Sequence, residues 1–361
     1  MTLIPIATSE APPDDLGHAR RRWVSIAWLT ALMTVLLAVI VCACGIGPVA
    51  VPPLTVARIV GHHVAGVPAA SEWTAAQDAI VWRVRVPRVL LGALVGAGLA
   101  VSGAVLQTVV RNVLADPHIL GVTSGASTGA ALSLLFGVTA GAGMLSGSAF
   151  LGALAATVLL FAVARSHGQV TSLRLLLGGV TIGYVFSAAT SFLIFASDSP
   201  EGARAVLFWL LGSLGSAAWP AVATTTAAVS GCVVALFLMA TRLDALAVGD
   251  DTARTLGFAP TRWRVAALAV VSLCVGAVVA VAGAIGFVGL IVPHTARLLA
   301  GGGHRRLIPA SALLGAVFLV VADVVARTAF SPRELPLGIV TAVVGAPLLL
   351  VLIRRFRNPV A

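Results

Sequence analysis

Lysine is missing from this chain of 361 residues, in which every basic residue is an arginine. A phosphate-binding loop of the GxxxxGK[ST] type requires a lysine, so the chain cannot carry a nucleotide site of that kind. Any ATP hydrolysis that depends on such a loop must therefore belong to another subunit.

Charged residues are also scarce. They make up 10% of the chain, whereas hydrophobic residues make up 59% and the mean hydropathy is +1.05. About a quarter of the residues of a soluble domain are charged, so a lipid bilayer is the expected solvent. The net charge of +10 suits basic residues that flank membrane spans, and it favours lipid over nucleic acid as a partner. We predict an all-α integral membrane protein.

Ten apolar segments are predicted to span the membrane, with boundaries taken from hydropathy, from glycine and proline breaks and from arginine positions. They lie near 23–45, 88–109, 119–137, 147–164, 174–197, 219–241, 265–283, 285–300, 308–328 and 336–353. Residues 1–22 would then be a cytoplasmic tail, and 23–361 a single transmembrane domain. An even number of spans places both termini on one side.

Arginines are distributed unequally over the predicted connections. If the N-terminus is inside, sixteen arginines face the cytoplasm and seven face the outer side. Because basic residues are retained on the cytoplasmic side, this distribution places both termini in the cytoplasm.

Residues for catalysis or metal binding follow no recognisable pattern. The seven histidines have no metal-ligand spacing, and the four cysteines fall within apolar segments, where they resemble small hydrophobic residues. Asp323 is the only acidic residue placed within a predicted span, and it can pair with Arg327 four residues later. A secondary transporter would carry ionisable groups deep in its spans, so it is the less favoured alternative. The sequence predicts neither a metal site nor an enzyme.

Glycines recur at helical spacing in two predicted spans. Gly121, Gly125 and Gly129 form one series, and Gly92 and Gly96 form another. Glycines four residues apart leave a smooth face on which helix backbones approach closely, so we predict tight helix packing at both places.

The segment 242–264 is the longest predicted cytoplasmic connection and the richest in charge. A short helix ending at a glycine, with Asp250 and Arg254 paired, is predicted from the spacing of Leu246, Asp250, Ala253, Arg254, Leu256 and Gly257. Two interpretations stay open, namely a solvated loop and a surface helix that docks a partner protein.

On the outer side, Arg83, Arg85 and Arg88 directly precede a predicted span, at a place where insertion does not require positive charge. Two interpretations stay open here as well. The arginines either contact lipid headgroups or bind acidic residues of an external partner.

Six blocks in order resemble the permease subunits of ABC importers for iron-siderophores, haem and cobalamin. They cover the chain from about residue 80 to the C-terminus and read RVPRVLLGALVGAGLAVSGAVLQ, RNVLADPHILGVTSGAS, LRLLLGGVTIG, AVGDDTARTLG, AGAIGFVGLIVPHTARLL and ELPLGIVTAVVGAP. The resemblance implies the architecture of a type II ABC importer permease in a bacterial inner membrane.

The resemblance also implies partners and a cargo. A second permease subunit, giving a homodimer, two cytoplasmic ATPases and an extracytoplasmic substrate-binding protein would complete the importer. ATP and magnesium would bind the ATPases, and this chain would bind no cofactor. Ferric siderophore is the cargo that we expect first, with haem or cobalamin as alternatives.

Site residues follow from the matching blocks. The resemblance assigns binding-protein docking to Arg85, Arg88 and Arg327, and contact with the ATPases to Asp250, Asp251, Ala253, Arg254, Leu256 and Gly257. It assigns a cytoplasmic gate to Asn112, Leu114, Thr171, Ser172 and Leu173, with Val113 where relatives have proline. It assigns the wall of the pathway to Gly178, Gly179, Gly183, Tyr184, Ser187 and Thr190.

Overall fold

Each of the ten predicted spans corresponds to a helix in the computed structural model, which describes residues 18–68, 73–136, 142–164 and 171–356. The helices are α1 (His18–Gly45), α4 (Val86–Val110), α5 (Val122–Leu135), α6 (Ala142–Ala164), α7 (Ser172–Phe195), α9 (Trp219–Leu238), α12 (Pro260–Ala282), α13 (Val288–Ala300), α14 (His304–Thr328) and α15 (Leu337–Phe356). Helix α1 begins inside the range predicted as a tail, and residues 1–17 lie outside the described residues.

Seven of the helical segments in the described part of the chain are long and apolar enough to cross a membrane. The longest, Ala75–Val110, joins α3 (Ala75–Asp78), the π-helix η1 (Ala79–Arg85) and α4 into one continuous run. Helices α5 and α13 are only 14 and 13 residues long, or about 20 Å at 1.5 Å per residue, and are too short to cross alone. The 3-10 helix η2 (Pro117–Leu120) directly precedes α5.

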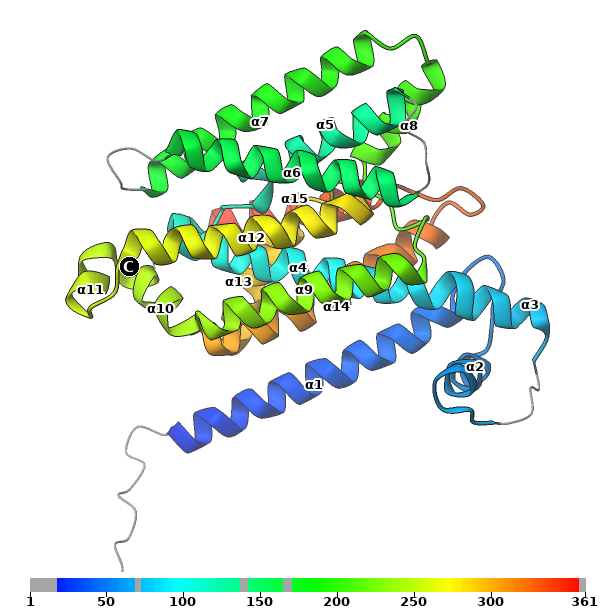
Figure 1. Cartoon of the computed structure of the whole chain (residues 1–361). Helices are drawn as coiled ribbons and strands as arrows, with labels where there is room; N and C mark the ends of the chain where they lie inside the picture. Colours follow the sequence, from blue (N-terminus) through cyan, green and yellow to red (C-terminus); the bar gives the residue numbers. More distant parts are fainter. Residues whose placement is uncertain (1–17, 69–72, 137–141, 165–170, 357–361) are drawn as a thin grey trace, which may run out of the picture.

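Short helices that hydropathy does not predict lie toward the ends of the bundle (Figure 1). Helix α2 (Pro53–Ala65) lies beside α3 at one end, here called the α2–α3 end, toward which α8 (Pro200–Leu210) also lies. Helices α10 (Ala240–Val248) and α11 (Asp250–Thr255) form the opposite end, here called the α10–α11 end. Helix α1 begins at the α10–α11 end and runs to the α2–α3 end.

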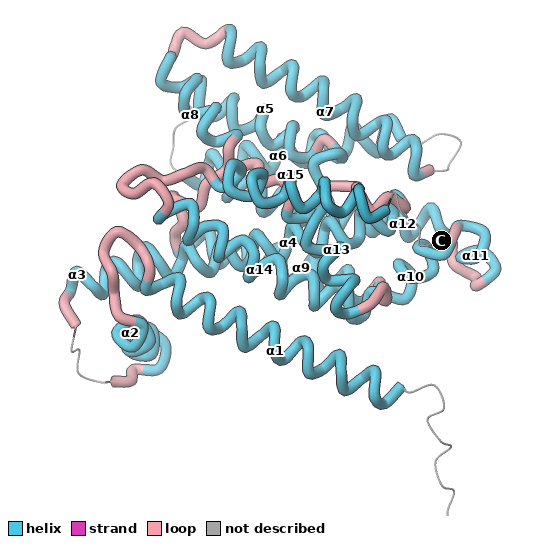
Figure 2. Tube along the Cα trace, turned by 180° about the vertical axis from the view of Figure 1, so that it is seen from behind, coloured by secondary structure: helices cyan, strands magenta, loops and turns pink. Residues whose placement is uncertain are grey.

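Helix α4 is the central helix of the bundle and packs against α14, α12, α13 and α9. Helices α5, α6, α7 and α8 form a layer on one side of this centre, and α1 lies on the opposite side (Figures 1 and 2). Only 6% of the apolar stretch of α1 is buried, whereas 78% of the stretch containing α4 is buried. The interior is therefore built around α4, with α1 attached to its outside.

Glycines bring several helix backbones into direct contact, as predicted. A Cβ atom on Gly96 would lie 2.1 Å from the Gly315 carbonyl oxygen, so α4 and α14 meet here without side chains between them. Gly125 and Gly129 bring α5 similarly close to α6. Gly121, predicted to continue the same helix face, instead precedes α5 with a φ of 75° and lies against α7. Gly92 meets the side chains of Leu214 and Val320 and no backbone atom, so it does not bring two helix backbones together.

Candidate translocation and coupling sites

Arg88 lies at the α2–α3 end of α4 and is held by two acidic residues. Its Nε donates to Asp323 Oδ1 at 2.9 Å, and its two terminal nitrogens donate to the Glu334 carboxylate at 2.9 Å each. Arg327 Nε lies 3.1 Å from the second oxygen of Asp323, so the pair predicted from the spacing of Asp323 and Arg327 is confirmed. The hydrogen bonds from Arg88 lower the pKa of Glu334, which lies outside the spans.

Arg85 and Arg327 bind the last turn of α1 and the backbone that follows it. Arg85 donates to the carbonyl oxygens of Cys44 and Gly45 at 3.0 Å and to that of Val49. Arg327 donates to Ala43 at 2.9 Å and to Ile46 at 3.0 Å. The carbonyls of Ala43, Cys44 and Gly45 belong to the last turn of α1, where carbonyls have no intrahelical donor, so the two arginines stabilise the end of this helix.

This arrangement corrects the expectation that Arg85, Arg88 and Arg327 lie open to a partner. All three are buried, at 5 to 7% exposure, because their guanidinium groups satisfy carbonyls and carboxylates of the same chain. Arg83 and Arg333, nearby in the sequence, are exposed instead. The docking role of the three buried arginines therefore stays a prediction.

The two segments predicted to form a gate lie together. Ser172 Oγ, at the start of α7, donates to the Val109 carbonyl oxygen at the end of α4, at 3.1 Å. The loop that follows α4 turns because the Asn112 side chain accepts from Leu114 N at 2.9 Å. Asn112, Leu114, Thr171 and Leu173 are exposed, so the two segments form one surface at this end of α4 and α7.

Helix α7 divides the predicted pathway residues into two groups. Tyr184 and Ser187 are exposed and Gly183 is partly exposed. Gly178, Gly179 and Thr190 are buried instead, which corrects the expectation that they face an open wall. The two glycines face α6 and η2, and Thr190 Oγ1 lies 2.8 Å from Thr128 Oγ1 on α5.

The predicted coupling segment is folded, but as two helices. Gly249 separates α10 from α11 with a φ of 148°, a conformation that favours glycine. Helix α11 stops before Gly257, whose amide donates to the Arg254 carbonyl at 2.9 Å, so the predicted end is confirmed. Leu246 belongs to α10, and the single helix that we predicted from Leu246 onward is wrong.

The charges of this segment pair differently from the prediction. Asp250 binds Arg264 at 2.7 Å and also Arg111, whereas Arg254 binds Asp251 at 2.8 Å. The expected Asp250–Arg254 pair is therefore wrong, because Asp250 pairs with Arg111 at the end of α4 and with Arg264 of α12 instead. Burial opposes the ionisation of Asp250, but its hydrogen bond and charge contacts with Arg264 outweigh burial and lower its pKa.

Only part of the predicted coupling set is available to a partner. Asp251, Arg254, Leu256 and Gly257 are exposed, and Val248 adds a further exposed apolar side chain. Ala253 is fully buried, which corrects its assignment as a contact residue. The exposed residues form a mixed apolar and charged surface at the α10–α11 end.

His304 is a buried histidine that joins α4, α10 and α14 at this end, and it is not among the site residues predicted from the sequence. His304 Nδ1 lies 2.6 Å from Asp244 Oδ1 on α10, and its Nε2 lies 2.9 Å from Thr108 Oγ1 on α4. Burial opposes the ionisation of Asp244, but the hydrogen bonds from His304 outweigh it and lower the pKa of Asp244. The three residues are far apart in the sequence, so spacing gives no signal for them.

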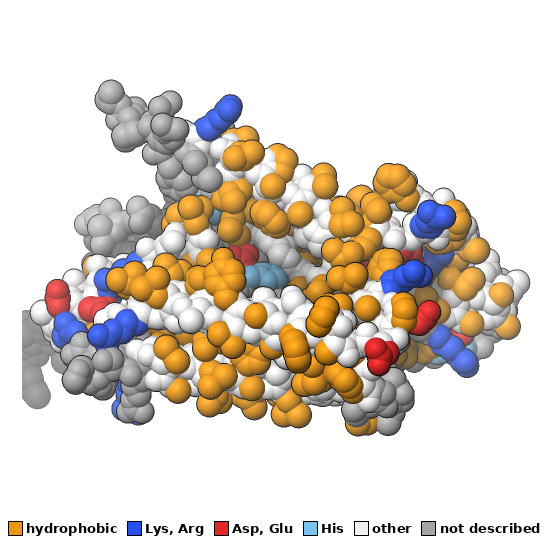
Figure 3. Space-filling view, turned by 90° about the horizontal axis from the view of Figure 1, so that it is seen from above, with side chains coloured by type: hydrophobic (Ala, Val, Ile, Leu, Met, Phe, Trp, Pro, Cys, Tyr) orange, Lys and Arg blue, Asp and Glu red, His pale blue; other side chains and the backbone are white. Residues whose placement is uncertain are grey.

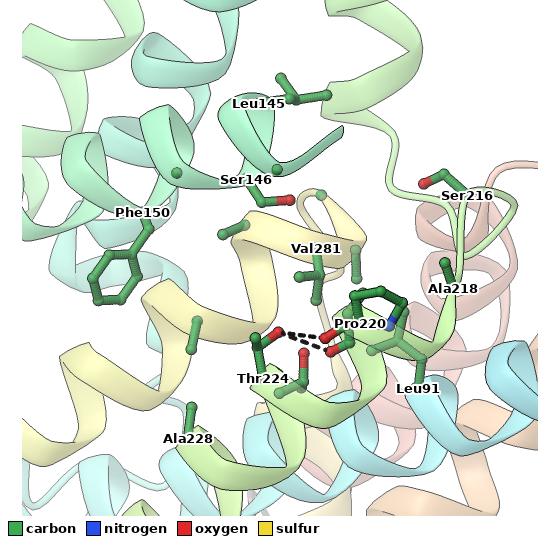
Figure 4. Close-up of a pocket in the computed structure, with 18 of the residues that line it drawn as sticks. Leu91, Leu145, Ser146, Phe150, Ser216, Ala218, Pro220, Thr224, Ala228 and Val281 are labelled. Atoms are coloured by element: carbon green, nitrogen blue, oxygen red, sulfur yellow. Dashed lines mark hydrogen bonds between the residues drawn. The ribbon is translucent and has the colours of Figure 1, made fainter. Parts of the chain in front are cut away.

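A cavity of about 710 Å³ opens on a different part of the bundle from the predicted pathway residues (Figure 4). It lies among α6, α9 and α12, and none of the described residues that line it is charged. Thr224 lines the cavity, but its hydroxyl donates back to the carbonyls of Pro220 and Ala221. Among the described residues we also find no group of histidine, cysteine, aspartate and glutamate that could hold a metal ion.

The surface of the molecule has the charge distribution of a membrane protein. On the face shown in Figure 3 the middle is mainly hydrophobic, and most charged side chains gather toward the two ends. One acidic side chain and one histidine are visible in a hollow between the helices of this face. Together with the seven apolar segments, this pattern places the helical bundle across a membrane.

Comparison with known proteins identifies the family. The sequence model of the FecCD transport family matches residues 34–355. The chain belongs to the FecCD transport family.

Relatives of this FecCD-family chain are named as cobalamin permeases. It is 40% identical to "Cobalamin import system permease protein BtuC" of Halobacterium salinarum, over 91% of this chain and 96% of the relative. It is 42% identical to "Vitamin B12 import system permease protein BtuC" of Vibrio cholerae, over 77% and 83% of the two chains.

A solved structure supports the same architecture. It is described as an inward-facing conformation of a metal-chelate type ABC transporter, and it matches with a TM-score of 0.80 and 34% identity, over 91% of this chain and 99% of the other. The expected type II ABC importer permease fold is thus confirmed, and the FecCD-family chain is a multi-pass permease of an ABC importer.

Proposed function

We propose that this chain is the membrane permease of an ATP-driven importer of cobalamin. The observation that carries the proposal is the 40% identity, over 91% of the chain, to a permease named for cobalamin import. Ferric siderophore, the cargo expected first from the sequence, has no comparable support among these relatives. Cobalamin, first considered as an alternative, is therefore the preferred cargo.

The α10–α11 end is the proposed contact with the ATPases. Val248 and Leu256 expose apolar side chains there, beside the charged Asp251 and Arg254. Such a mixed surface suits a protein partner better than lipid. This end is then cytoplasmic, and because α1 begins there, the N-terminal end of the described chain is cytoplasmic too. The predicted positions of the termini and of the bacterial inner membrane are retained in this proposal.

A second copy of the chain is the proposed partner within the membrane. Helices α7 and α15 expose large apolar side chains, among them Leu177, Tyr184, Phe192, Val343 and Leu350. In the proposed homodimer this face encloses the pathway, with Gly183, Tyr184 and Ser187 along it and the gate surface of Asn112, Leu114, Thr171, Ser172 and Leu173 at its cytoplasmic end. A wall with few charges suits a bulky cargo that must be released.

The energy for transport is proposed to come from two ATPase subunits, which would bind ATP and magnesium. An extracytoplasmic binding protein would deliver the cargo at the α2–α3 end. The permease itself would need no cofactor, since its part is to hold two conformations and exchange them.

Deletion of the encoding gene in its host tests the cargo. A cobalamin-dependent strain should lose uptake of radiolabelled cobalamin at low external concentration, and expression of the intact chain should restore it. Uptake of ferric siderophore, measured in the same strain, is the control and should not change. Loss of siderophore uptake with normal cobalamin uptake would replace cobalamin by siderophore as the cargo.

A further inference from the structure

Hydrogen bonds in series join three buried or half-buried side chains, which are Asp244 on α10, His304 at the start of α14 and Thr108 on α4. Asp244 Oδ1 accepts from the His304 backbone amide at 2.9 Å and lies 2.6 Å from His304 Nδ1. The other ring nitrogen of His304 lies 2.9 Å from Thr108 Oγ1. His304 is 1% exposed and Thr108 is 7% exposed, so water is excluded from the contact between them, whereas the Asp244 side chain is 44% exposed.

One direction in this connection is fixed, because an ionised carboxylate only accepts, so His304 Nδ1 donates to the Asp244 carboxylate. On the other side of the ring, the Thr108 hydroxyl lies 2.9 Å from His304 Nε2 and 3.1 Å from the Ala104 carbonyl oxygen one helical turn earlier. The contact between His304 and Asp244 is then a charge-assisted bond, which is shorter and stronger than a neutral one.

A second connection joins the same two regions one helical turn further along α4. Arg111 Nε donates to the Leu246 carbonyl oxygen on α10 at 3.3 Å, and its guanidinium binds Asp250 on α11. Arg111 ends α4 with a φ of 54° and directly precedes Asn112. Helices α10 and α11 are thus attached to α4 at two points, immediately before the predicted gate loop.

We propose that Thr108, His304 and Asp244, together with Arg111, carry the movement of α10 and α11 to the end of α4 and so to the gate loop. The inference rests on the proposed function, because it requires ATPases that push on α10 and α11. These residues are positioning residues, since they act on the gate through α4. The proposal requires that the packed helices exchange between two arrangements, and these side-chain contacts would make α10 and α4 change together.

Thr108→Val tests the inference, because valine keeps the shape of threonine and removes its hydroxyl. The matched control is Thr157→Val, since Thr157 is also 7% exposed and also donates to the carbonyl four residues earlier, at 2.9 Å. The first measurement is cobalamin taken up per ATP hydrolysed, in proteoliposomes that contain the whole importer. We expect Thr108→Val to lower this ratio at least about fivefold, and Thr157→Val to leave it at the wild-type value.

A second measurement does not depend on the cargo. In the same complexes, a charged maleimide labels a cysteine placed at the exposed gate residue Leu114, and the labelling rate is compared with and without ATP. We expect wild type and Thr157→Val to show an ATP-dependent change in rate, and Thr108→Val to lose most of it. Thermal unfolding of each complex establishes that the variants are equally folded.

The outcomes separate the inference from the proposed function. If wild type shows the ATP-dependent labelling change but takes up no cobalamin, the cargo is wrong and the connection is still judged by Thr108→Val. If Thr108→Val matches Thr157→Val in both measurements, the connection is wrong. A double variant that combines Thr108→Val with Asp244→Ala should be no worse than either single change, because both changes interrupt the same series of hydrogen bonds. Additive losses would contradict the proposal.

Discussion

Both terminal nitrogens of Arg88 donate to the Glu334 carboxylate at 2.9 Å, across 246 positions of sequence. The third guanidinium nitrogen, Nε, donates to Asp323, and the Arg88 side chain is 9% exposed. This bidentate contact holds the loop between α14 and α15 against the start of α4. A partner carboxylate that binds Arg88 must therefore take the place of Glu334.

Arg88→Gln is expected to destabilise the permease. It would leave Asp323, which is 1% exposed, with Arg327 as its remaining ionic partner in the cluster. Removal of one member of a buried ion pair costs about 3 kcal/mol, and we expect a loss of that order in the free energy of unfolding. Arg83→Gln, at an exposed position in η1 five residues before Arg88, is the control and should change stability little. Equal stability of the two variants would contradict a structural role for Arg88.

Arg254→Glu is expected to uncouple ATP hydrolysis from transport. Arg254 is exposed on α11, and its pair with the fully exposed Asp251 contributes little to stability. Insertion and thermal unfolding should therefore be unchanged, while uptake per ATP hydrolysed falls. Arg262→Glu, a charge reversal at another exposed position near the start of α12, is the control. Normal coupling in Arg254→Glu would remove α11 from the ATPase contact.

Acidification should weaken the attachment of α11 through Asp250. The pKa of this carboxyl group is lowered in the folded chain by Arg264, so its stabilising effect is complete above its ordinary pKa of 3.8 and is lost as the pH falls through the lower folded value. Thermal unfolding of wild type and Asp250→Asn should therefore differ at about pH 6, and the difference should shrink progressively as the pH falls below about 4. Asp251→Asn, whose side chain is 99% exposed, should follow wild type. A constant difference between wild type and Asp250→Asn would contradict the assignment.

Gly103→Ala should separate α4 from α13. A Cβ atom at position 103 would lie 1.8 Å from the Gly289 carbonyl oxygen, and backbone cannot yield as a flexible side chain does. Overpacking of this kind typically costs about 1–3 kcal/mol of unfolding free energy. Gly231→Ala is the matched control in α9, because nothing lies within 4 Å of its added Cβ. Thermal unfolding measures both variants, and an unperturbed Gly103→Ala would mean that the helices are further apart.

Hydropathy predicts the existence of the long helices well, because each must present apolar side chains to lipid over many residues. It misses α2 and α8, which are 13 and 11 residues long and therefore too short to give a spanning signal. Pairing within one helix is predicted for Asp323 and Arg327, since a helix fixes the distance between positions four apart.

Pairing between different helices is not predicted by local sequence spacing. The i, i+4 rule predicts Arg254 as the partner of Asp250, but the fold brings Arg264 and Arg111 closer. Likewise, the scattered histidines give no indication that His304 meets Asp244 and Thr108, which lie 60 and 196 positions away. Such contacts depend on how helices are arranged in space, and this information is not contained in local spacing.

Arg85 and Arg327 contact α1 and the residues after it through main-chain carbonyls. A main-chain carbonyl is present whatever the amino acid, so these hydrogen bonds do not depend on which side chains the helix carries. Because only 6% of the apolar stretch of α1 is buried, most side chains of that stretch can change in size without altering how the helix is attached.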